Sequence, residues 1–349
     1  GYSAYDPEET DLKIEQALET SGPRKCSSIN DVWGGCSTCP HFQKVSSPLL
    51  IQGKNTIPTA STGFHFIDFE KPNAKPRPDY EGLRKHFENK HYYKGLDDSG
   101  SVHIWDQTHY KPMGTTFIDA FCQDNFNPPA KNNMRSEFRG LVKCTNVKPI
   151  QWWQDTPKRK INFQNGYLDI DSMDFRPHDK EIGFRYVLPY EYDPQADAPI
   201  FTNMLQTVTG YHEDAQKVLL EFMGYALSND DCWTQKALIL TGEGANGKST
   251  FIEVLQKLAG SDNYSSLNLE NIAASEYSKQ LLDGKLFNVS EETPTRALLD
   301  SSLFKCLVTG GEIQVRQPFQ APYFIKNRAK LISTCNELPA AIDNSYGFY

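Results

Sequence analysis

Nine residues of this chain, GEGANGKST at 242–250, have the types and spacing needed to hold the phosphates of a nucleotide. Gly242, Gly247, Lys248 and Ser249 follow the G-x-x-x-x-G-K-[ST] pattern of a P-loop. Glycines let backbone N–H groups curl around phosphate oxygens, and a helix start adds positive potential. We expect Lys248 to reach the β- and γ-phosphates of ATP and Ser249 to ligate Mg²⁺. The expected nucleotide-binding residues are Gly242, Gly244, Asn246, Gly247, Lys248, Ser249 and Thr250.

The flanking sequence predicts the elements that position this loop. An apolar run at 237–240 reads as a strand, and the pattern at 251–255 reads as the start of a helix. The alternative is a glycine-rich turn that binds nothing, but strand, loop and helix in this order favour the P-loop.

A pair of carboxylates, Glu291 and Glu292, follows a second apolar run at 286–290. We expect one of them to help hold Mg²⁺ and the other to orient or deprotonate the attacking water, because phosphoryl transfer depends mostly on positioning and charge. The alternative is an acidic pair that caps a helix start. Further along, a strand at 329–334 leads to Asn336, which could sense the γ-phosphate or serve equally well as a turn residue.

Residues 313–316 and 323–326 predict the two strands of a hairpin. Phe319 lies near its expected tip, and Arg316 and Lys326 lie on its arms. Such a hairpin could contact the phosphates and bases of single-stranded DNA, although an ordinary solvated hairpin has the same pattern. The short basic run 158–160 is more typical of a solvated face than of a DNA contact.

Four possible metal ligands, Cys26, Cys36, Cys39 and His41, are clustered near the start of the chain. Thiolates and an imidazole could close a tetrahedral Zn²⁺ site. The C-x9-C-x2-C-x-H spacing is not that of a standard finger, so buried, free or oxidised thiols remain the alternative.

Composition describes a globular protein of two or three units: 349 residues, 38% hydrophobic, net charge −8. The acidic balance excludes a global attraction to nucleic acid but not a locally basic channel. No apolar run reaches 18 residues, so no membrane span is expected. Thinly spread cysteines suggest free thiols in a reducing compartment. The chain begins at Gly1 with a polar, acidic stretch and no initiator methionine, so we expect part of a longer protein without a signal peptide.

Coarse patterning predicts an irregular start, then strand-like pieces at 64–66 and 102–105 with a helix near 80–91 between them. Residues 161–192 look extended, with Asn165-Gly166 as a hairpin turn, and 199–227 look helical.

Several stretches together resemble superfamily 3 helicases, and most closely the D5-like and P4-type primase-helicases of phages, plasmids and large DNA viruses. They are INFQNGYLDI, LPYEYDPQADAP, LEFMGYALS, LILTGEGANGKSTFIEVLQKLAG, LDGKLFNVSEE, FKCLVTGGEIQVRQPF and KLISTCNELP, with DNSYGF after the last. The resemblance covers residues 160–349 well and 60–160 more weakly.

This resemblance implies an α/β fold with an AAA+-like P-loop core, preceded by a mixed α+β, helical D5 N-terminal-like region. The implied divisions are a cysteine-containing segment 1–60, a D5 N-terminal-like and collar region 61–230, and an ATPase domain 231–349. It also implies that Lys305 opens a DNA-contacting segment and that Asn336 is sensor 1. Glu291 and Glu292 would form Walker B, with Glu291 on Mg²⁺ and Glu292 facing the attacking water. The hairpin from Arg316 to Lys326 would then grip DNA in a pore.

The implied activity is an ATP-dependent DNA helicase, a homo-oligomeric ring, a hexamer by family pattern, moving 3′→5′ on single-stranded or forked DNA in the host bacterial cytoplasm. An arginine finger is expected beyond Tyr349, and a primase-polymerase domain upstream. Two other functions stay open: an ATP-controlled initiator or loader with little unwinding, and a P-loop kinase, for which no acceptor pocket or lid is recognisable.

Overall fold

The computed structural model describes residues 65–66, 77–96, 99–126, 130–291, 301–318 and 320–336. The chain divides into two compact units, residues 1–83 with 122–134, and residues 84–121 with 135–349. Three helices contribute residues to both: α3 (Tyr80–Lys90), α4 (Thr115–Asp124) and α5 (Asn132–Lys143).

In the first unit, β1 (His65–Phe66) pairs antiparallel with β2 (Arg77–Pro78). The ring of Tyr80 packs edge-on against Phe126, with 6.5 Å between centroids. The pairing of β1 confirms the strand expected near 64–66, as a strand of two residues.

The second unit contains a small mixed sheet in the order β5-β4-β3-β6. Its strands are β3 (Tyr93–Leu96), β4 (Val102–Trp105), β5 (Tyr110–Met113) and β6 (Val147–Lys148). Phe87 packs edge-on against Tyr93, Phe121 and Phe138 within 6.1 Å, so an aromatic core holds this sheet against the helices.

A three-stranded antiparallel sheet follows, after the short helix α6 (Gln151–Gln154). It consists of β7 (Lys160–Phe163), β8 (Gly166–Asp169) and β9 (Asp174–Arg176), and the 3₁₀ turn η3 (Lys180–Ile182) follows it. The expected hairpin is confirmed, but its turn is Gln164–Asn165, because Gly166 already pairs with Phe163 in the ladder. Gly166 is needed for another reason: a Cβ there would overlap the carbonyl oxygen of Arg176 on β9.

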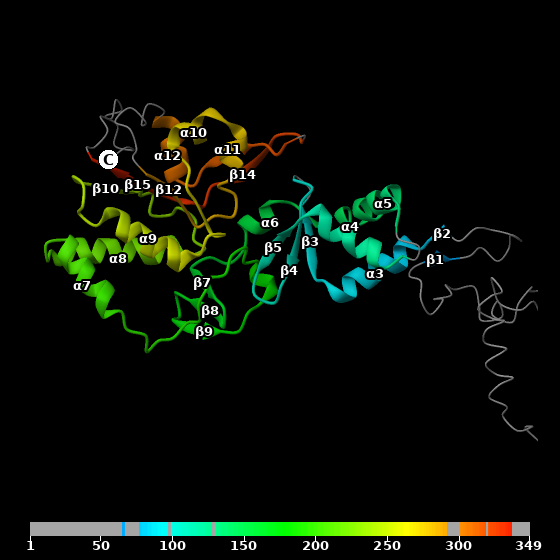
Figure 1. Cartoon of the computed structure of the whole chain (residues 1–349), viewed down its shortest axis with the longest axis horizontal. Coiled ribbons are helices and arrows are strands. Elements are labelled where there is room, and N and C mark those ends of the chain that lie inside the picture. The colour runs from blue at the N-terminus through cyan, green and yellow to red at the C-terminus, as the bar shows by residue number, and fades with distance from the viewer. Residues whose placement is uncertain are drawn as a thin grey trace, which may run out of the picture. The chain divides into compact units, whose positions relative to one another are not determined.

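The central element is a parallel sheet in the order β10-β15-β12-β11. Its strands are β10 (Leu238–Thr241), β11 (Tyr264–Ser265), β12 (Phe287–Ser290) and β15 (Lys330–Cys335). Figure 1 shows α8 and α9 on one face of this sheet and α10 and α12 on the other. The surrounding helices are α7 (Pro199–Val208), α8 (Glu213–Leu227), α9 (Lys248–Ala259), α10 (Leu269–Ala274), α11 (Glu276–Gln280) and α12 (Ser301–Val308). The fold is thus mixed α/β, as expected.

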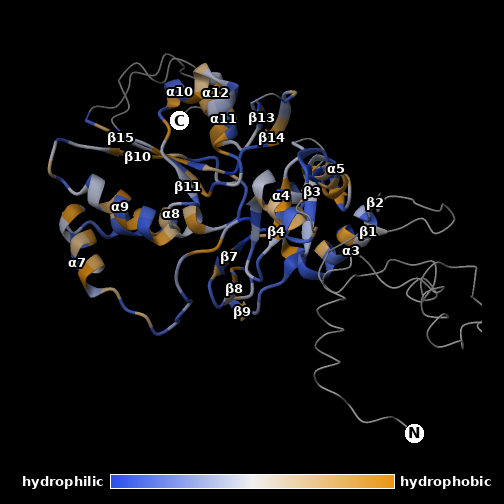
Figure 2. Cartoon of the chain, turned by 45° about the vertical axis from the view of Figure 1, so that its right-hand side comes forward, coloured by the Kyte–Doolittle hydropathy of each residue, from blue (hydrophilic) through white to orange (hydrophobic). Residues whose placement is uncertain are grey.

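Neighbouring residues of β15 serve different cores, because successive strand side chains point to opposite faces. Ile332 packs with α8 and α9, while Leu331 packs with α10 and α12. In Figure 2, α8 and α9 carry both hydrophilic and hydrophobic residues, as helices with one buried face do. The core that contains Ile332 also includes Phe184 and Leu227, so packing continues across the expected boundary at 230; the three domain limits stay predictions.

The expected second hairpin is confirmed as β13 (Glu312–Val315) and β14 (Tyr323–Lys326), paired antiparallel. Ile313, Val315, Tyr323 and Ile325 are buried, so one face of the hairpin joins the core. None of the described helices is long and apolar enough to cross a membrane.

Candidate functional site

The carboxyl ends of three parallel strands bring the predicted site residues to one edge of the central sheet. Thr241 of β10 pairs with Cys335 of β15, and Ser290 of β12 pairs with Ser333. The next residue after each strand is therefore Gly242, Asn336 or Glu291. In open α/β sheets this carboxyl edge is where ligands bind.

The glycine loop has a backbone that demands glycine at two positions. Gly242 has φ +147° and Gly247 has φ +84°, a region that side chains strain. A Cβ on Gly247 would overlap Cγ1 of Val208 in α7 and lie 3.1 Å from its Cβ. Gly244 differs, because it has no neighbour within 4 Å of an added Cβ. The loop is therefore held by packing at its end and open in its middle.

Lys248, the first residue of α9, folds back over this loop. Its Nζ donates to the carbonyl oxygens of Gly242 and Glu243, the latter at 3.0 Å, and to Oδ1 of Asn246 at 3.0 Å. Burial raises the pKa of the Cys335 thiol, and the nearby Lys248 ammonium partly opposes this rise. The ammonium thus contacts the loop and lies near enough to the end of β15 to act on Cys335. Its partners are loop acceptors that phosphate oxygens could replace.

The first turn of α9 supplies further donors. Gly247 is its N-cap and provides no side-chain bond to the helix start. Ser249 and Thr250 lie in this turn, and both are exposed. Free N–H groups and the helix dipole favour an anion here. The sequence expectation of a strand, a loop and a helix is confirmed in geometry, while the binding of ATP and Mg²⁺ stays a prediction.

The predicted carboxylates and the predicted sensor are only partly described. Glu291 and Asn336 are both exposed and immediately follow their strands. Glu292 lies outside the described residues, so its assigned role stays a prediction. No described group of three or more His, Cys, Asp or Glu residues could hold a metal ion by itself.

The hairpin residues predicted to bind DNA do not gather in one place. Arg316 follows β13, and its Nε donates to the carbonyl oxygen of Gln320 at 2.9 Å. Lys326 ends β14 at the other end of the hairpin, and its Nζ lies 3.0 Å from Oδ2 of Asp231. Lys305 lies in α12, and Phe319 lies outside the described residues. Their DNA contacts stay predictions.

Two residues that the sequence reasoning did not single out belong to these regions. Val208 closes the end of the glycine loop, and Phe324 is an exposed aromatic on β14, with 57% of its surface accessible. The strand pattern buried-exposed-buried at 323–325 could have identified Phe324, because an apolar residue at an outward position is conspicuous. No local pattern points to Val208.

The predicted zinc ligands Cys26, Cys36, Cys39 and His41 all lie outside the described residues, so zinc stays a prediction. The five described cysteines are thiols and not disulfides, as expected: Cys122, Cys144, Cys232, Cys306 and Cys335.

Comparison with known proteins gives two family matches. Residues 81–210 match the family described as D5 N terminal like, and residues 240–346 match a Family of unknown function (DUF5906). The expected D5-like relationship is thereby confirmed. The second match contains the whole glycine loop together with Glu291 and Asn336.

One curated relative and two solved chains are also similar. The "Putative helicase L207/L206" of Acanthamoeba polyphaga mimivirus is 25% identical over 189 residues, which is 51% of this chain and 20% of that protein. The apo structure of the NrS-1 C terminal region (305-718) has a TM-score of 0.48 and 17% identity, over 77% of this chain and 60% of that one. An A form apo structure of the same region has a TM-score of 0.45 and 16% identity, over 74% and 57%.

Proposed function

We propose that this D5-like chain is the ATP-hydrolysing part of a DNA helicase that acts with a primase. The observation that carries the proposal is the meeting of Lys248, Glu291 and Asn336 at one sheet edge. Sequence positions 242, 291 and 336 are far apart, yet the register of three parallel strands places them together. Such an edge, with a glycine loop and a helix start, suits a nucleoside triphosphate.

The chemistry would follow from the groups at this edge. Backbone N–H groups of residues 243–248 and the Lys248 ammonium would hold the β- and γ-phosphates of ATP. Bound Mg²⁺, held by Ser249 and Glu291, would neutralise charge that develops on the phosphate oxygens. Glu292 would take a proton from a water molecule while the oxygen of that water attacks the γ-phosphorus. The bond from that phosphorus to the bridging oxygen breaks, and ADP leaves with the electron pair. Asn336 would donate to a γ-phosphate oxygen.

The movement driven by ATP hydrolysis would be travel along single-stranded DNA by a ring of identical subunits. The family resemblance supports a hexamer and 3′→5′ travel. The exposed apolar residues Ile200 and Val218 of α7 and α8 support assembly, with 87% and 56% of their surfaces accessible. A neighbouring subunit would supply an arginine to the γ-phosphate, as trans-acting arginines do in other NTPases. The forked-DNA substrate and a primase-polymerase domain in the same protein belong to this proposal.

The experiment is steady-state ATP hydrolysis with and without oligo(dT). Lys248→Ala should remove hydrolysis while leaving the thermal unfolding midpoint close to that of the unchanged protein, because Lys248 contacts loop carbonyls and not the core. Lys257→Ala is the matched control, an exposed lysine of the same helix. Hydrolysis that persists in Lys248→Ala would place the activity elsewhere.

Strand displacement separates this proposal from an ATP-controlled initiator or loader. A helicase should show DNA-stimulated hydrolysis and unwind a forked duplex. An initiator or loader should bind ATP and DNA with little unwinding. Native mass measurement with an ATP analogue and oligo(dT) checks the ring, and a monomer under these conditions would contradict it.

A further inference from the structure

A cavity lies at the amino-terminal edge of the parallel sheet, at the opposite ends of the strands from the glycine loop. Ser228, Asn229 and Asp230 line it ahead of β10, and Leu286 lines it just before β12. Lys330, the first residue of β15, also lines it. The space is about 670 Å³ when the solvent on its open side is included. Lys330 begins β15 and Asn336 follows its last residue, so roughly 20 Å of extended backbone separates this cavity from Asn336. The cavity is thus not part of the proposed ATP site.

The residues that line this cavity carry more positive than negative charge. Its five cationic side chains are Arg185, Lys285, Lys326, Arg328 and Lys330, and its two carboxylates are Asp230 and Asp283. The carboxylate of Asp283 is already taken by a two-pronged ion pair with Arg185, at 2.7 and 2.9 Å. A local surplus of positive charge in a chain of net charge −8 attracts anions.

Lys330 is the most deeply buried of these cations, with 2% of its surface accessible. Its Nζ donates to the carbonyl oxygens of Ser228 at 2.9 Å and Asp230 at 2.8 Å. Burial lowers the pKa of Lys330 to about 8, so most of its ammonium groups stay charged at pH 7. It therefore adds a positive potential to the inside of the cavity.

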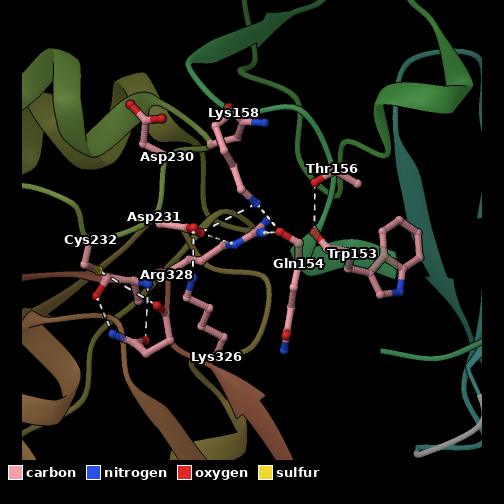
Figure 3. Close-up of polar contacts among 12 residues, drawn as sticks. Trp153, Gln154, Thr156, Lys158, Asp230, Asp231, Cys232, Lys326 and Arg328 are labelled. Carbon is pink, nitrogen blue, oxygen red and sulfur yellow. Dashed lines mark hydrogen bonds and ion pairs between the residues drawn. The ribbon is translucent and has the colours of Figure 1, made fainter. Parts of the chain in front are cut away.

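Three cations at the rim converge on a single carboxylate, Asp231, as Figure 3 shows. Its Oδ1 lies 2.9 Å from Nε of Arg328 and 3.6 Å from Nζ of Lys158, and its Oδ2 lies 3.0 Å from Nζ of Lys326. Arg328 and Lys158 also donate to the carbonyl oxygen of Gln154, at 2.6 and 2.5 Å. The cations are thus held in place. A second carboxylate, Asp155, also acts on Arg328 and partly opposes the lowering of its pKa by burial, but two carboxylates cannot neutralise three cations.

An exposed aromatic ring stands beside this rim. Phe324 and Lys326 are two residues apart on β14, so their side chains leave the same face of the hairpin. The two residues are about 7 Å apart along the strand. A cation that meets phosphate beside an aromatic that stacks a base is the pairing by which proteins bind single strands.

We infer that the rim formed by Lys158, Lys326 and Arg328 binds a backbone phosphate of single-stranded DNA, with a neighbouring base against Phe324. This inference rests on the proposed function, because it names contacts for the DNA of that activity. A phosphate accepts charge-assisted hydrogen bonds from the three cations. Asp231 orders these cations in the free protein and competes with the phosphate when DNA arrives.

The test is fluorescence anisotropy of labelled oligo(dT) without ATP, across a range of salt concentrations. Lys158→Gln and Lys326→Gln change side chains that are 25% and 38% accessible and lie outside the apolar core, so the fold should be kept. Each should lower affinity roughly 3- to 10-fold at low salt. Each should also reduce the slope of log K against the logarithm of the salt concentration by about 0.7 in magnitude, because the protein neutralises one phosphate fewer. Asp231→Asn should act in the opposite direction and tighten binding, because it removes the competing carboxylate.

Lys217→Gln is the matched control, since Lys217 is an exposed cation of α8 that faces Glu221. If both rim variants bind oligo(dT) with the affinity and slope of this control, the inference is overturned. Calorimetry with inorganic pyrophosphate tests the other source of phosphate. If the rim variants bind oligo(dT) like the control, but pyrophosphate binds the unchanged protein and not Lys326→Gln, the cavity takes free phosphates and the inference is also overturned. Hydrolysis that survives in Lys248→Ala would instead remove the proposed ATP site and leave the rim result standing.

Discussion

Val208 of α7 lies so close to Gly247 that the glycine loop has no room for a side chain at its last position. The contact joins a helix before the loop to the first turn of the helix after it. Gly247→Ala should lower the free energy of unfolding by about 2–4 kcal/mol, because it adds a strained φ of +84° and an overlap with Val208. Chemical denaturation measures the decrease, and nucleotide binding should weaken in parallel.

Gly244→Ala is the control for this prediction, because an added Cβ there meets nothing within 4 Å. The double variant Gly247→Ala, Val208→Ala should recover part of the stability, since the overlap is relieved but the backbone strain remains. A double variant no more stable than the sum of the two single changes would show that the Val208 contact is not responsible.

The two glutamates after β12 should differ in their effects. Glu292→Gln should keep nucleotide affinity and block turnover, because phosphate contacts remain while the water loses its base. Glu291→Gln should weaken the dependence of ATP hydrolysis on the Mg²⁺ concentration. Binding of a fluorescent nucleotide, compared with the hydrolysis rate, separates the two effects. A turnover defect confined to Glu291→Gln would show that the roles are exchanged.

The ion pair between Arg185 and Asp283 should be important for stability. Burial by itself would raise the pKa of Asp283, but Arg185 outweighs it and the pKa is lowered. Asp283→Asn leaves the Arg185 charge without its counter-ion, so we expect a decrease of about 2–4 kcal/mol in the free energy of unfolding. Asp174→Asn, which breaks the exposed pair with Arg176, should leave the denaturation midpoint almost unchanged. Equal decreases in the two variants would contradict the prediction.

His103 should make the protein sensitive to acid. Its ring packs on Trp153 and its Nδ1 is buried without a hydrogen-bond partner. Burial lowers the pKa of His103 from 6.5 to about 3. The Arg185 charge adds to this decrease, and the Asp283 charge partly opposes it. Between these values the unfolded chain binds a proton that the folded one does not, so stability falls as the pH falls. From pH 6.5 to pH 4 the decrease should be on the order of 3 kcal/mol.

Denaturation midpoints at pH 6.5 and pH 4 test this prediction. His103→Phe should reduce the difference between the two midpoints, while the exposed His212→Gln should not. The pKa of Asp283 lies below its ordinary value, so that group also costs stability on acidification, but mainly below about pH 4. An unchanged difference in His103→Phe would assign the acid sensitivity to other groups.

The sequence by itself determined the glycine loop, its flanking strand and helix, and most of the strands and helices around it. Gly242, Gly247 and Lys248 could be recognised because a phosphate loop depends on residues that are neighbours in sequence. The hairpin at 312–326 followed in the same way from alternating apolar residues. The turn at Gln164–Asn165 was misplaced by one residue, because Gly166 is required by the distant strand β9 and not by the turn itself.

Only the tertiary structure decided which of these pieces meet. The pairing of Thr241 with Cys335 brings Asn336 to the loop, and the contact of Val208 with Gly247 fixes the loop from outside. The tertiary structure also places Lys326 against Asp231. The cationic rim of Lys158, Lys326 and Arg328 is thus formed by residues that are scattered in the sequence. Two of these contacts, Thr241–Cys335 and Asp231–Lys326, join positions about a hundred residues apart. They depend on how sheets and helices pack, whereas local sequence patterns reflect only the preferences of neighbouring residues.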